Sequence, residues 1–241
     1  MDKYWLERTE LLVKEEGLEK LNKASILVVG LGGVGSFAAE FIARAGVGAM
    51  TIVDGDTVDI TNINRQLPAL RSTVDQHKVE VVAERLLDIN PDLKLTKINE
   101  FLVPERMAEV LDSGKFDYVL DCIDSVSPKI NLIVAARRRK IKIISAMGAG
   151  GKTDPSKVMV KDISKTQDCH LAKQVRKRLR KEKIDKGFKC VFSKEIQKSD
   201  SLKMTDGTNF KRSFYGTISY MPAIFGLYAA SEVITYLLNK E

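Results

Sequence analysis

A glycine-rich turn limits the fold more than any other feature of this sequence. The run Gly30-Leu31-Gly32-Gly33-Val34-Gly35 follows an apolar segment at residues 25–29 and precedes a segment with helical spacing. Between a strand and a helix, such a turn lets backbone N–H groups and the helix N-terminus approach a phosphate. We therefore expect a parallel sheet that binds a nucleotide at the carboxyl ends of its strands.

The rest of the first 150 residues alternates between apolar runs and stretches with helical spacing. This alternation predicts an α/β, Rossmann-like and mostly parallel sheet. Ser72 and Asp75 fit a capping box at the start of the second predicted helix. The predicted strands are 25–29, 50–53, 93–98, 118–122 and 141–145, and the predicted helices are 34–45, 74–89, 104–111 and 128–138.

The pattern changes after Gly148. The final apolar helix is expected to pack onto the sheet, because proline, glycines and Glu232 interrupt it as a membrane span. We expect one elaborated domain over residues 1–241, with a nucleotide-binding half at about 24–150 and a substrate- and tRNA-facing part at about 151–241. The predicted elements of the second part are a strand at 158–160, a helix from about Leu171, a strand at 188–192, an irregular polar stretch at 193–212 and a helix at 222–238.

The charge of the chain is unevenly distributed. Its 39 basic and 32 acidic residues leave a net charge of +7, and residues 173–189 alone account for that excess. A field of this sign favours a polyanionic partner, and a solvated helix face is the alternative. The three cysteines are odd in number and widely spaced, and the N-terminus lacks a secretory pattern, so we expect a reducing cytoplasm.

Polar residues after the second and fourth predicted strands point to a nucleoside triphosphate. Asp54 ends the second strand, where a carboxylate can accept hydrogen bonds from ribose hydroxyls, as it would in a dinucleotide site too. Arg65 and Lys78 can neutralise phosphate oxygens and stabilise a leaving pyrophosphate. Asp124 can hold Mg²⁺. Singly these residues would be ordinary surface charges, but beside the glycine turn they predict an ATP site.

Together these motifs resemble the ubiquitin-activating-type adenylating superfamily, the ThiF, MoeB and HesA group. The resemblance implies a homodimer in which Arg8, from an Arg-Thr-Glu-Leu-Leu run, reaches the nucleotide of the neighbouring subunit. It implies catalytic roles for Arg8, Arg65, Lys78 and Asp124. The residues that match its nucleotide site are Gly30, Gly32, Gly33, Gly35, Asp54, Asp56, Asn62, Arg65, Gln66, Lys78 and Asp124.

Residues 121–129, 148–155, 162–166 and 190–195 are most similar to the branch that dehydrates threonylcarbamoyladenosine in tRNA. This implies ATP-dependent closure of the threonylcarbamoyl side chain beside the anticodon, through an acyl-adenylate. The alternative is adenylation of the C-terminus of a small sulfur-carrier protein. Without any Cys-x-x-Cys pair, no zinc is expected. A sulfur-relay partner and a bound monovalent cation are left open.

If tRNA is the substrate, a second set of residues gains a role. Gly150 and Gly151 would line the substrate pocket, with a purely structural turn as an equal alternative, and Lys152 would meet the threonyl carboxylate. Cys190 is expected to be a core cysteine, and a nucleophile with a lowered pKa is the alternative. The residues expected to contact tRNA phosphates are Arg176, Lys177, Arg178 and Arg180.

Two further functions would fit parts of the sequence. One is a non-catalytic RNA-binding module that retains a decayed nucleotide site. The other is an NAD-dependent dehydrogenase, which ranks last because the chain offers no evident acid or base for hydride transfer.

Overall fold

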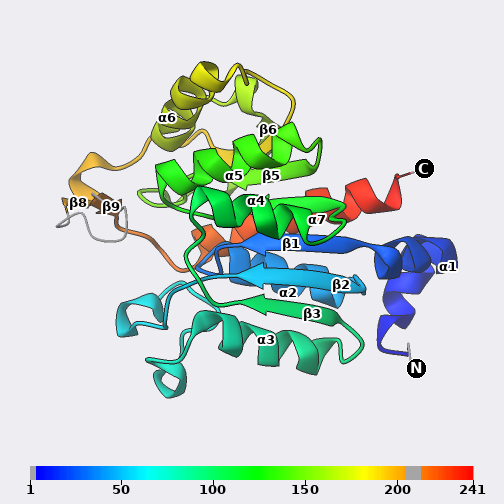
Figure 1. The fold of residues 1–241 in the computed structure, drawn as a ribbon. Helices are drawn as coiled ribbons and strands as arrows, with labels where there is room; N and C mark the ends of the chain where they lie inside the picture. The colour runs from blue at the N-terminus through cyan, green and yellow to red at the C-terminus, as the bar shows by residue number, and fades with distance from the viewer. Residues whose placement is uncertain (1–3, 205–212, 241) are drawn as a thin grey trace.

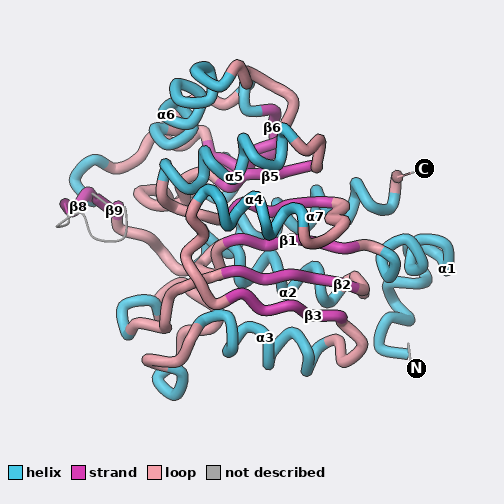
Figure 2. The backbone as a smooth tube through the Cα atoms, in the orientation of Figure 1, coloured by secondary structure: helices cyan, strands magenta, loops and turns pink. Residues whose placement is uncertain are grey.

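A seven-stranded sheet organises residues 4–204 and 213–240, the part of the chain described by this computed structural model. Its strand order is β3-β2-β1-β4-β5-β7-β6, and neighbouring strands are parallel except β6, which runs antiparallel to β7 at one edge (Figures 1 and 2). The predicted Rossmann-like fold class is therefore confirmed. The strands are β1 (Ser25–Val29), β2 (Ala49–Val53), β3 (Lys94–Ile98), β4 (Tyr118–Asp121), β5 (Lys142–Ala146), β6 (Val158–Asp162) and β7 (Lys189–Ser193).

Helices cover both faces of the sheet because its central strands are apolar on both sides. Along β1, Ile26 and Val28 belong to a core with α2, α3 and α7, whereas Leu27 and Val29 belong to a core with α4, α5 and α6. The helices are α1 (Glu7–Lys23), α2 (Gly35–Arg44), α3 (Lys78–Ile89), α4 (Pro104–Asp112), α5 (Val126–Arg138), α6 (His170–Leu179) and α7 (Tyr220–Leu238).

The carboxyl ends of β1 and β4 lie side by side at the middle of the sheet. The chain leaves β1 toward α2 on one face and leaves β4 toward α5 on the other. Such a reversal is where open α/β sheets bind their ligands. Figure 1 shows α1 and both ends of the described chain on the right, at the end of the sheet where the strands begin.

Helix α7 meets the length and hydropathy criteria for a membrane span, with a mean hydropathy of 1.4. Its buried side packs on α2 and on β5, β6 and β7. Met221, Phe225 and Val233 are inaccessible to solvent within that contact. The predicted packing of the last helix onto the sheet is confirmed.

The predicted start of α3 was wrong by four residues. The helix begins at Lys78, and Asp75 lies in the left-handed region with φ 68°, so Ser72 and Asp75 form no capping box. The reason is a non-local pairing: Val58 N–H donates to Gln76 O at 2.8 Å, and Asp75 N–H donates to Val58 O at 2.9 Å. This pairing places Lys78 beside the carboxyl end of β2.

Two further elements differ from the sequence prediction. Helix α1 was not predicted. The stretch predicted to be irregular contains β8 (Leu202–Met204), which pairs antiparallel with β9 (Ser213–Tyr215). Residues 205–212 of that stretch lie outside the described part of the chain.

Candidate active site

The glycine turn packs closely except at one position. Gly30 has φ 91°, which favours glycine, and a Cβ on Gly35 would lie 1.7 Å from the carbonyl oxygen of Gly30. A Cβ on Gly33 would lie 2.9 Å from Pro222 and 3.0 Å from the carbonyl oxygen of Arg65. A Cβ on Gly32 would meet nothing nearer than the Gln66 side chain at 3.8 Å. Gly32 thus leaves the backbone open to a ligand.

Asp54 holds the glycine turn through its carboxylate. Its Oδ2 accepts from Leu31 N–H at 2.6 Å, and its Oδ1 accepts from Asp56 N–H at 2.8 Å. Burial raises the pKa of Asp54, and the positive charge of Lys78 and the two N–H groups act in the opposite direction. The residue expected to bind ribose therefore also ties the end of β2 to the end of β1.

Lys78 places its ammonium beside Asp56. The side chain is 6% exposed, and Nζ lies 3.0 Å from Asp56 Oδ2. The Lys78 backbone N–H also donates to the carbonyl of Asp56 at 3.0 Å. These contacts bring Lys78 to the same edge of the sheet as the glycine turn, although α3 follows β2 by some 25 residues of sequence.

The Asn62–Gln66 segment folds over the glycine turn. Asn62 is buried and its Oδ1 accepts from Asp59 N–H at 3.2 Å within a short 3₁₀ turn. Arg65 Nη1 donates to Thr61 O at 2.9 Å, and burial lowers the pKa of Arg65 while the nearby carboxylates of Asp124 and Asp59 oppose that shift. The segment thus brings Arg65 and Asp124 close enough for their charges to interact.

Gln66 carries an unsatisfied polar atom. Its Oε1 is buried and has no hydrogen-bond partner within the described residues. Buried polar atoms are nearly always paired, so an orphaned one beside an open backbone is typical of a ligand site. Gln66 and Gly32 together therefore fit a bound nucleotide.

Asp124 lies just beyond β4 and is exposed. Ser125 Oγ donates to its Oδ1 at 3.3 Å. No group of three or more His, Cys, Asp or Glu side chains forms a metal cluster among residues 4–204 and 213–240. Mg²⁺ in nucleotide sites is commonly held by one or two carboxylates together with the phosphates, so a single carboxylate here fits that mode of binding.

Lys129 lies next to the candidate site, and no role was predicted for it from the sequence. It is completely buried, and its Nζ lies 2.8 Å from Asp121 Oδ2 at the end of β4. A lysine four residues into a helix looks like a surface residue in sequence. Only its position after Pro128 in the resembling segment 121–129 could have signalled it.

The glycines at 150 and 151 pack against the end of β9 and the residues that follow it. Gly151 has φ 72°, and a Cβ there would meet the Tyr215 ring at 3.1 Å. A Cβ on Gly150 would meet Tyr215 Cβ at 3.0 Å. This packing fits the structural alternative for both glycines. Asn64 Nδ2 donates to Thr217 O at 2.9 Å, so the same segment touches the nucleotide motif.

Lys152 points into the protein. It is 1% exposed, and its Nζ donates to the carbonyls of Ser193 at 2.8 Å and Glu195 at 2.9 Å. Burial lowers the pKa of Lys152. Both hydrogen bonds of the amine go to backbone oxygens, so in this structure it supports the turn instead of facing an open pocket, where a threonyl carboxylate was expected.

Arg8 does not join the other candidate residues within one chain. It is exposed near the start of α1. Leu6, just before α1, packs against Gly46 in the turn that leads into β2, which lies at the amino ends of the strands. The glycine turn lies at the carboxyl ends. Figure 1 shows α1 and the carboxyl ends of the strands at opposite ends of the sheet.

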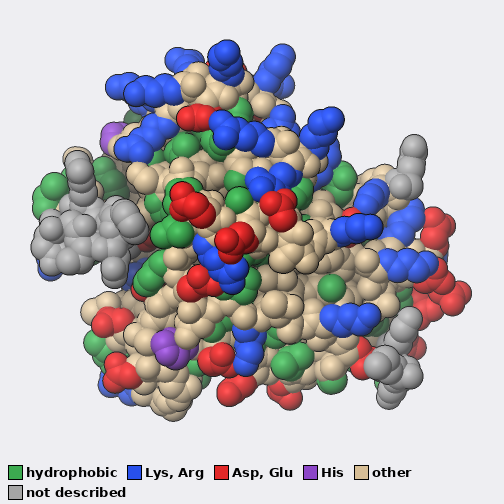
Figure 3. All heavy atoms as spheres, in the orientation of Figure 1, with side chains coloured by type: hydrophobic (Ala, Val, Ile, Leu, Met, Phe, Trp, Pro, Cys, Tyr) green, Lys and Arg blue, Asp and Glu red, His purple; other side chains and the backbone are tan. Residues whose placement is uncertain are grey.

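The basic residues of α6 and its following turn form one surface. Figure 3 shows Lys and Arg side chains gathered at the top of the molecule, over these elements. Lys177, Arg178 and Arg180 are exposed there, and Arg178 donates to Ser127 Oγ at 2.9 Å. Arg176 is instead half-buried and donates to the carbonyl and hydroxyl of Thr166. Three of the four expected tRNA contacts thus face solvent.

Cys169 and Cys190 are buried, and Cys122 is partly buried. Cys190 is completely buried on β7, and burial raises its pKa well above the ordinary value. Burial likewise raises the pKa of Cys122 to about 12. A thiol with a raised pKa carries little thiolate, which is the nucleophilic form. The geometry therefore fits the core position expected for Cys190.

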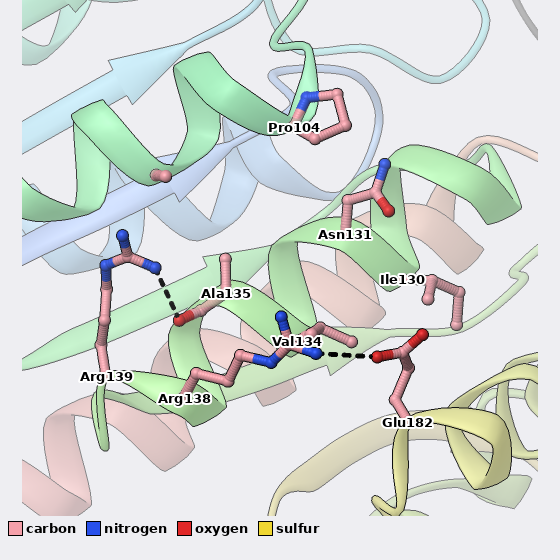
Figure 4. Close-up of a pocket in the computed structure, with 9 residues that line it drawn as sticks. Pro104, Ile130, Asn131, Val134, Ala135, Arg138, Arg139 and Glu182 are labelled. Carbon is pink, nitrogen blue, oxygen red and sulfur yellow. Dashed lines mark hydrogen bonds and ion pairs between the residues drawn. The ribbon is translucent and has the colours of Figure 1, made fainter.

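A separate cavity of about 280 Å³ lies between α4, α5 and the turn at Arg180–Glu182. In Figure 4 Arg138, from α5, reaches across to Glu182, with 3.0 Å between Nη2 and Oε2. The residues that line it include none of the candidate nucleotide-binding residues. It is thus distinct from the site at the ends of β1 and β4.

Comparison with known proteins agrees with this geometry. The ThiF family model matches residues 6–241, and the chain belongs to the ThiF family. It is 42% identical to the tRNA threonylcarbamoyladenosine dehydratase of Bacillus subtilis, with 96% of this chain and 94% of the relative covered. It is 40% identical to the enzyme of that name from Escherichia coli, with 98% and 95% covered.

A solved structure extends the similarity to three dimensions. The E. coli tRNA N6-threonylcarbamoyladenosine dehydratase, crystallised in complex with ATP, matches with a TM-score of 0.88 and 38% identity. The match covers 100% of this chain and 97% of the E. coli chain. The Salmonella typhimurium molybdopterin-synthase adenylyltransferase is also similar, at 40% identity, but over only 54% of this chain and 51% of its own length.

Proposed function

We propose that this chain is an ATP-dependent tRNA threonylcarbamoyladenosine dehydratase. The observation that carries the proposal is the arrangement of Arg65, Lys78 and Asp124 beside an open glycine turn, in a fold shared almost end to end with an ATP-bound enzyme of that name. The strands of the nucleotide-binding half, β1 through β5, and the later strands β6 and β7 belong to one sheet, which supports a single adenylating domain.

ATP would lie across the carboxyl ends of β1 and β4. Gly32 would let the backbone approach the phosphates, and the orphaned Oε1 of Gln66 would accept from the nucleotide. Asp54 and Asp56 lie where the ribose is expected. Asp124 would hold Mg²⁺, which supplies charge neutralisation at the phosphates when it is bound.

The protein has two tasks in this reaction. It must hold the threonyl carboxylate in line with the α-phosphate, and it must stabilise the charge that develops on the leaving pyrophosphate. Lys78 and Arg65 supply cations for the second task. The carbamoyl group then displaces AMP within the same molecule, and this proximity can contribute on the order of 7 kcal/mol or more without a protein nucleophile.

The exposed basic residues of α6 would bind tRNA. Lys177, Arg178 and Arg180 form a sequence-independent contact with phosphates, and the pocket at the ends of the strands would read the modified base. A tRNA-modifying function also favours a cytoplasmic location.

We further propose a homodimer in which Arg8 completes the partner's site. Exposed apolar residues at the start of the chain support an interface there: Trp5 is 42% exposed, Leu11 70% and Leu12 82%. Mixed dimers of Arg8→Ala and Lys78→Ala subunits test this assignment. If Arg8 acts across the interface, each mixed dimer holds one intact site and activity returns; if it acts within its own chain, no site is intact.

The function itself is tested by incubating the protein with ATP, Mg²⁺ and tRNA that carries threonylcarbamoyladenosine. The masses of the nucleosides released by mild digestion are then measured. The expected product is lighter by one water, and it forms only with ATP. Failure to form it under these conditions contradicts the proposal.

The second candidate is adenylation of a small sulfur-carrier protein. It is favoured by the similarity of 54% of this chain to molybdopterin-synthase adenylyltransferases. An exchange of labelled pyrophosphate into ATP that requires such a carrier and ignores tRNA would support it. The near full-length match to the dehydratases favours the first candidate.

A further inference from the structure

The completely buried ion pair between Lys129 and Asp121 lies directly beneath the candidate site. Both side chains have no exposed surface, and Nζ lies 2.8 Å from Asp121 Oδ2. Isolating two charges from water is costly, and a pair of apolar residues of similar size is often at least as stable. The pair therefore calls for an explanation besides stability.

All three protons of the ammonium have acceptors. Besides Asp121, Lys129 donates to Ser145 Oγ at 3.2 Å and to the Ala146 carbonyl at 3.0 Å. Ser145 Oγ donates in turn to Asp121 Oδ2 at 2.5 Å. Asp121 ends β4, and Ser145 and Ala146 end β5. One side chain from α5 thus joins the carboxyl ends of two neighbouring strands.

The second oxygen of Asp121 acts on the turn that carries Asp124. Asp121 Oδ1 accepts from Ile123 N–H at 3.1 Å, which fixes the backbone one residue before Asp124. Cys122, which lies between Asp121 and Ile123, donates its N–H to Val29 O at 2.9 Å. Its carbonyl oxygen also packs closely on the glycine turn, since a Cβ on Gly30 would lie 2.9 Å from it. The pair is therefore linked to both the metal-binding carboxylate and the glycine turn.

We propose that Lys129 is a positioning residue: by joining β4, β5 and α5 it holds the Ile123–Asp124 turn where Asp124 can bind Mg²⁺ beside the phosphates of ATP. This inference rests on the proposed function. Residues that orient a metal ligand commonly change metal affinity or activity by about 10- to 100-fold when they are replaced. Lys129 and Asp121 act on Asp124 in this way, through the backbone.

The test is the affinity for ATP, measured by calorimetry with Mg²⁺ and with excess chelator. The double variant Lys129→Met with Asp121→Asn removes both buried charges, so neither is left unpaired. We expect ATP affinity in Mg²⁺ to fall about tenfold or more, and affinity in chelator to change little. Ser145→Ala, which keeps the ion pair and removes one acceptor, should give a smaller change of the same kind.

Glu40→Gln is the matched control. Glu40 is 9% exposed and pairs with Arg85 at 2.5 Å and with Arg44, between α2 and α3. Its replacement also removes a buried charge from an ion-pair network, although the two arginines are half exposed. It should leave the Mg²⁺ dependence of ATP affinity unchanged. The inference is overturned if the variants at Lys129, Asp121 and Ser145 keep the wild-type Mg²⁺ dependence, whatever their stability. Wild-type protein that binds no ATP would overturn the proposed function instead.

Discussion

Lys78 and Asp56 form an ion pair whose two members differ in exposure. The lysine side chain is 6% exposed and the aspartate side chain 44%, and 3.0 Å separates Nζ from Oδ2. The buried ammonium thus pairs with a carboxylate that is open to solvent. A phosphate oxygen that took the place of Asp56 Oδ2 could pair with the ammonium without any large movement of the lysine stem.

Lys78→Met is expected to abolish most of the catalysis and to leave the fold intact. Removal of one preorganised charge that stabilises a transition state costs about 10²- to 10³-fold in rate. Because Asp56 is well exposed, losing the pair should change the free energy of unfolding by about 1 kcal/mol or less. Turnover of modified tRNA and denaturant unfolding measure the two effects. Undiminished turnover would contradict a catalytic role for Lys78.

Two glycines of the turn should respond differently to alanine. Gly32→Ala places its Cβ 3.8 Å from Gln66, so it should fold normally and weaken ATP binding. Gly35→Ala places its Cβ 1.7 Å from the Gly30 carbonyl and should lower the free energy of unfolding by about 1–3 kcal/mol or more. Calorimetry with ATP and thermal unfolding separate the two outcomes. Equal loss of stability in both variants would contradict this account.

Cys190→Ala is expected to retain turnover. The thiol is completely buried and its pKa is raised, so in the native protein it should also resist alkylation at a pH where free thiols react. Mass spectrometry of the alkylated protein, native and then unfolded, checks the second point. A Cys190→Ala variant that folds but is inactive would restore the covalent mechanism.

Binding of tRNA should weaken steeply as salt rises. Each phosphate contact releases roughly one counterion, so Lys177→Ala and Arg180→Ala should each reduce the slope of log affinity against log salt by about one. Lys94→Ala is the control, since Lys94 is exposed on β3 at the other side of the sheet. If all three variants behave alike, α6 is not the tRNA surface.

Asp54→Asn should alter how stability depends on pH. Burial raises the pKa of Asp54 above its ordinary value of 3.8, so the folded state holds this proton more tightly than the unfolded state does. The contribution of Asp54 to stability is therefore greatest below 3.8 and declines as pH rises through the folded pKa. The variant cannot titrate. Relative to wild type, its free energy of unfolding should therefore increase as pH rises above 3.8; parallel curves would count against the shift.

Much of this architecture could be predicted because the signals are local. The five apolar runs and the glycine turn located β1 to β5 and the nucleotide edge, and the rule that parallel strands end together brought Asp54 and Asp124 to that edge. What could not be predicted depends on distant partners. The start of α3 is set by hydrogen bonds between Val58 and residues 75–76, and the inward direction of Lys152 is set by the carbonyls at 193 and 195.

The burial of charged side chains could not be predicted from the sequence either. Nothing in the spacing of Lys129 distinguishes it from a solvent-facing lysine, because its three acceptors come from the ends of two different strands. Similarly, Arg176 and Arg178 are neighbours in a basic run, yet one faces Thr166 and the other faces outward.

The contact of α7 with the glycine turn has a consequence for biosynthesis. Pro222 lies against Gly33, and a Cβ on Gly226 would lie 2.5 Å from the carbonyl of Val34, so residues nearly 200 positions downstream form the floor of the turn. During synthesis the glycine turn is complete long before α7, which packs against it, has been made. Nucleotide affinity should therefore emerge late in translation, after residues 220–238 have left the ribosomal tunnel and docked.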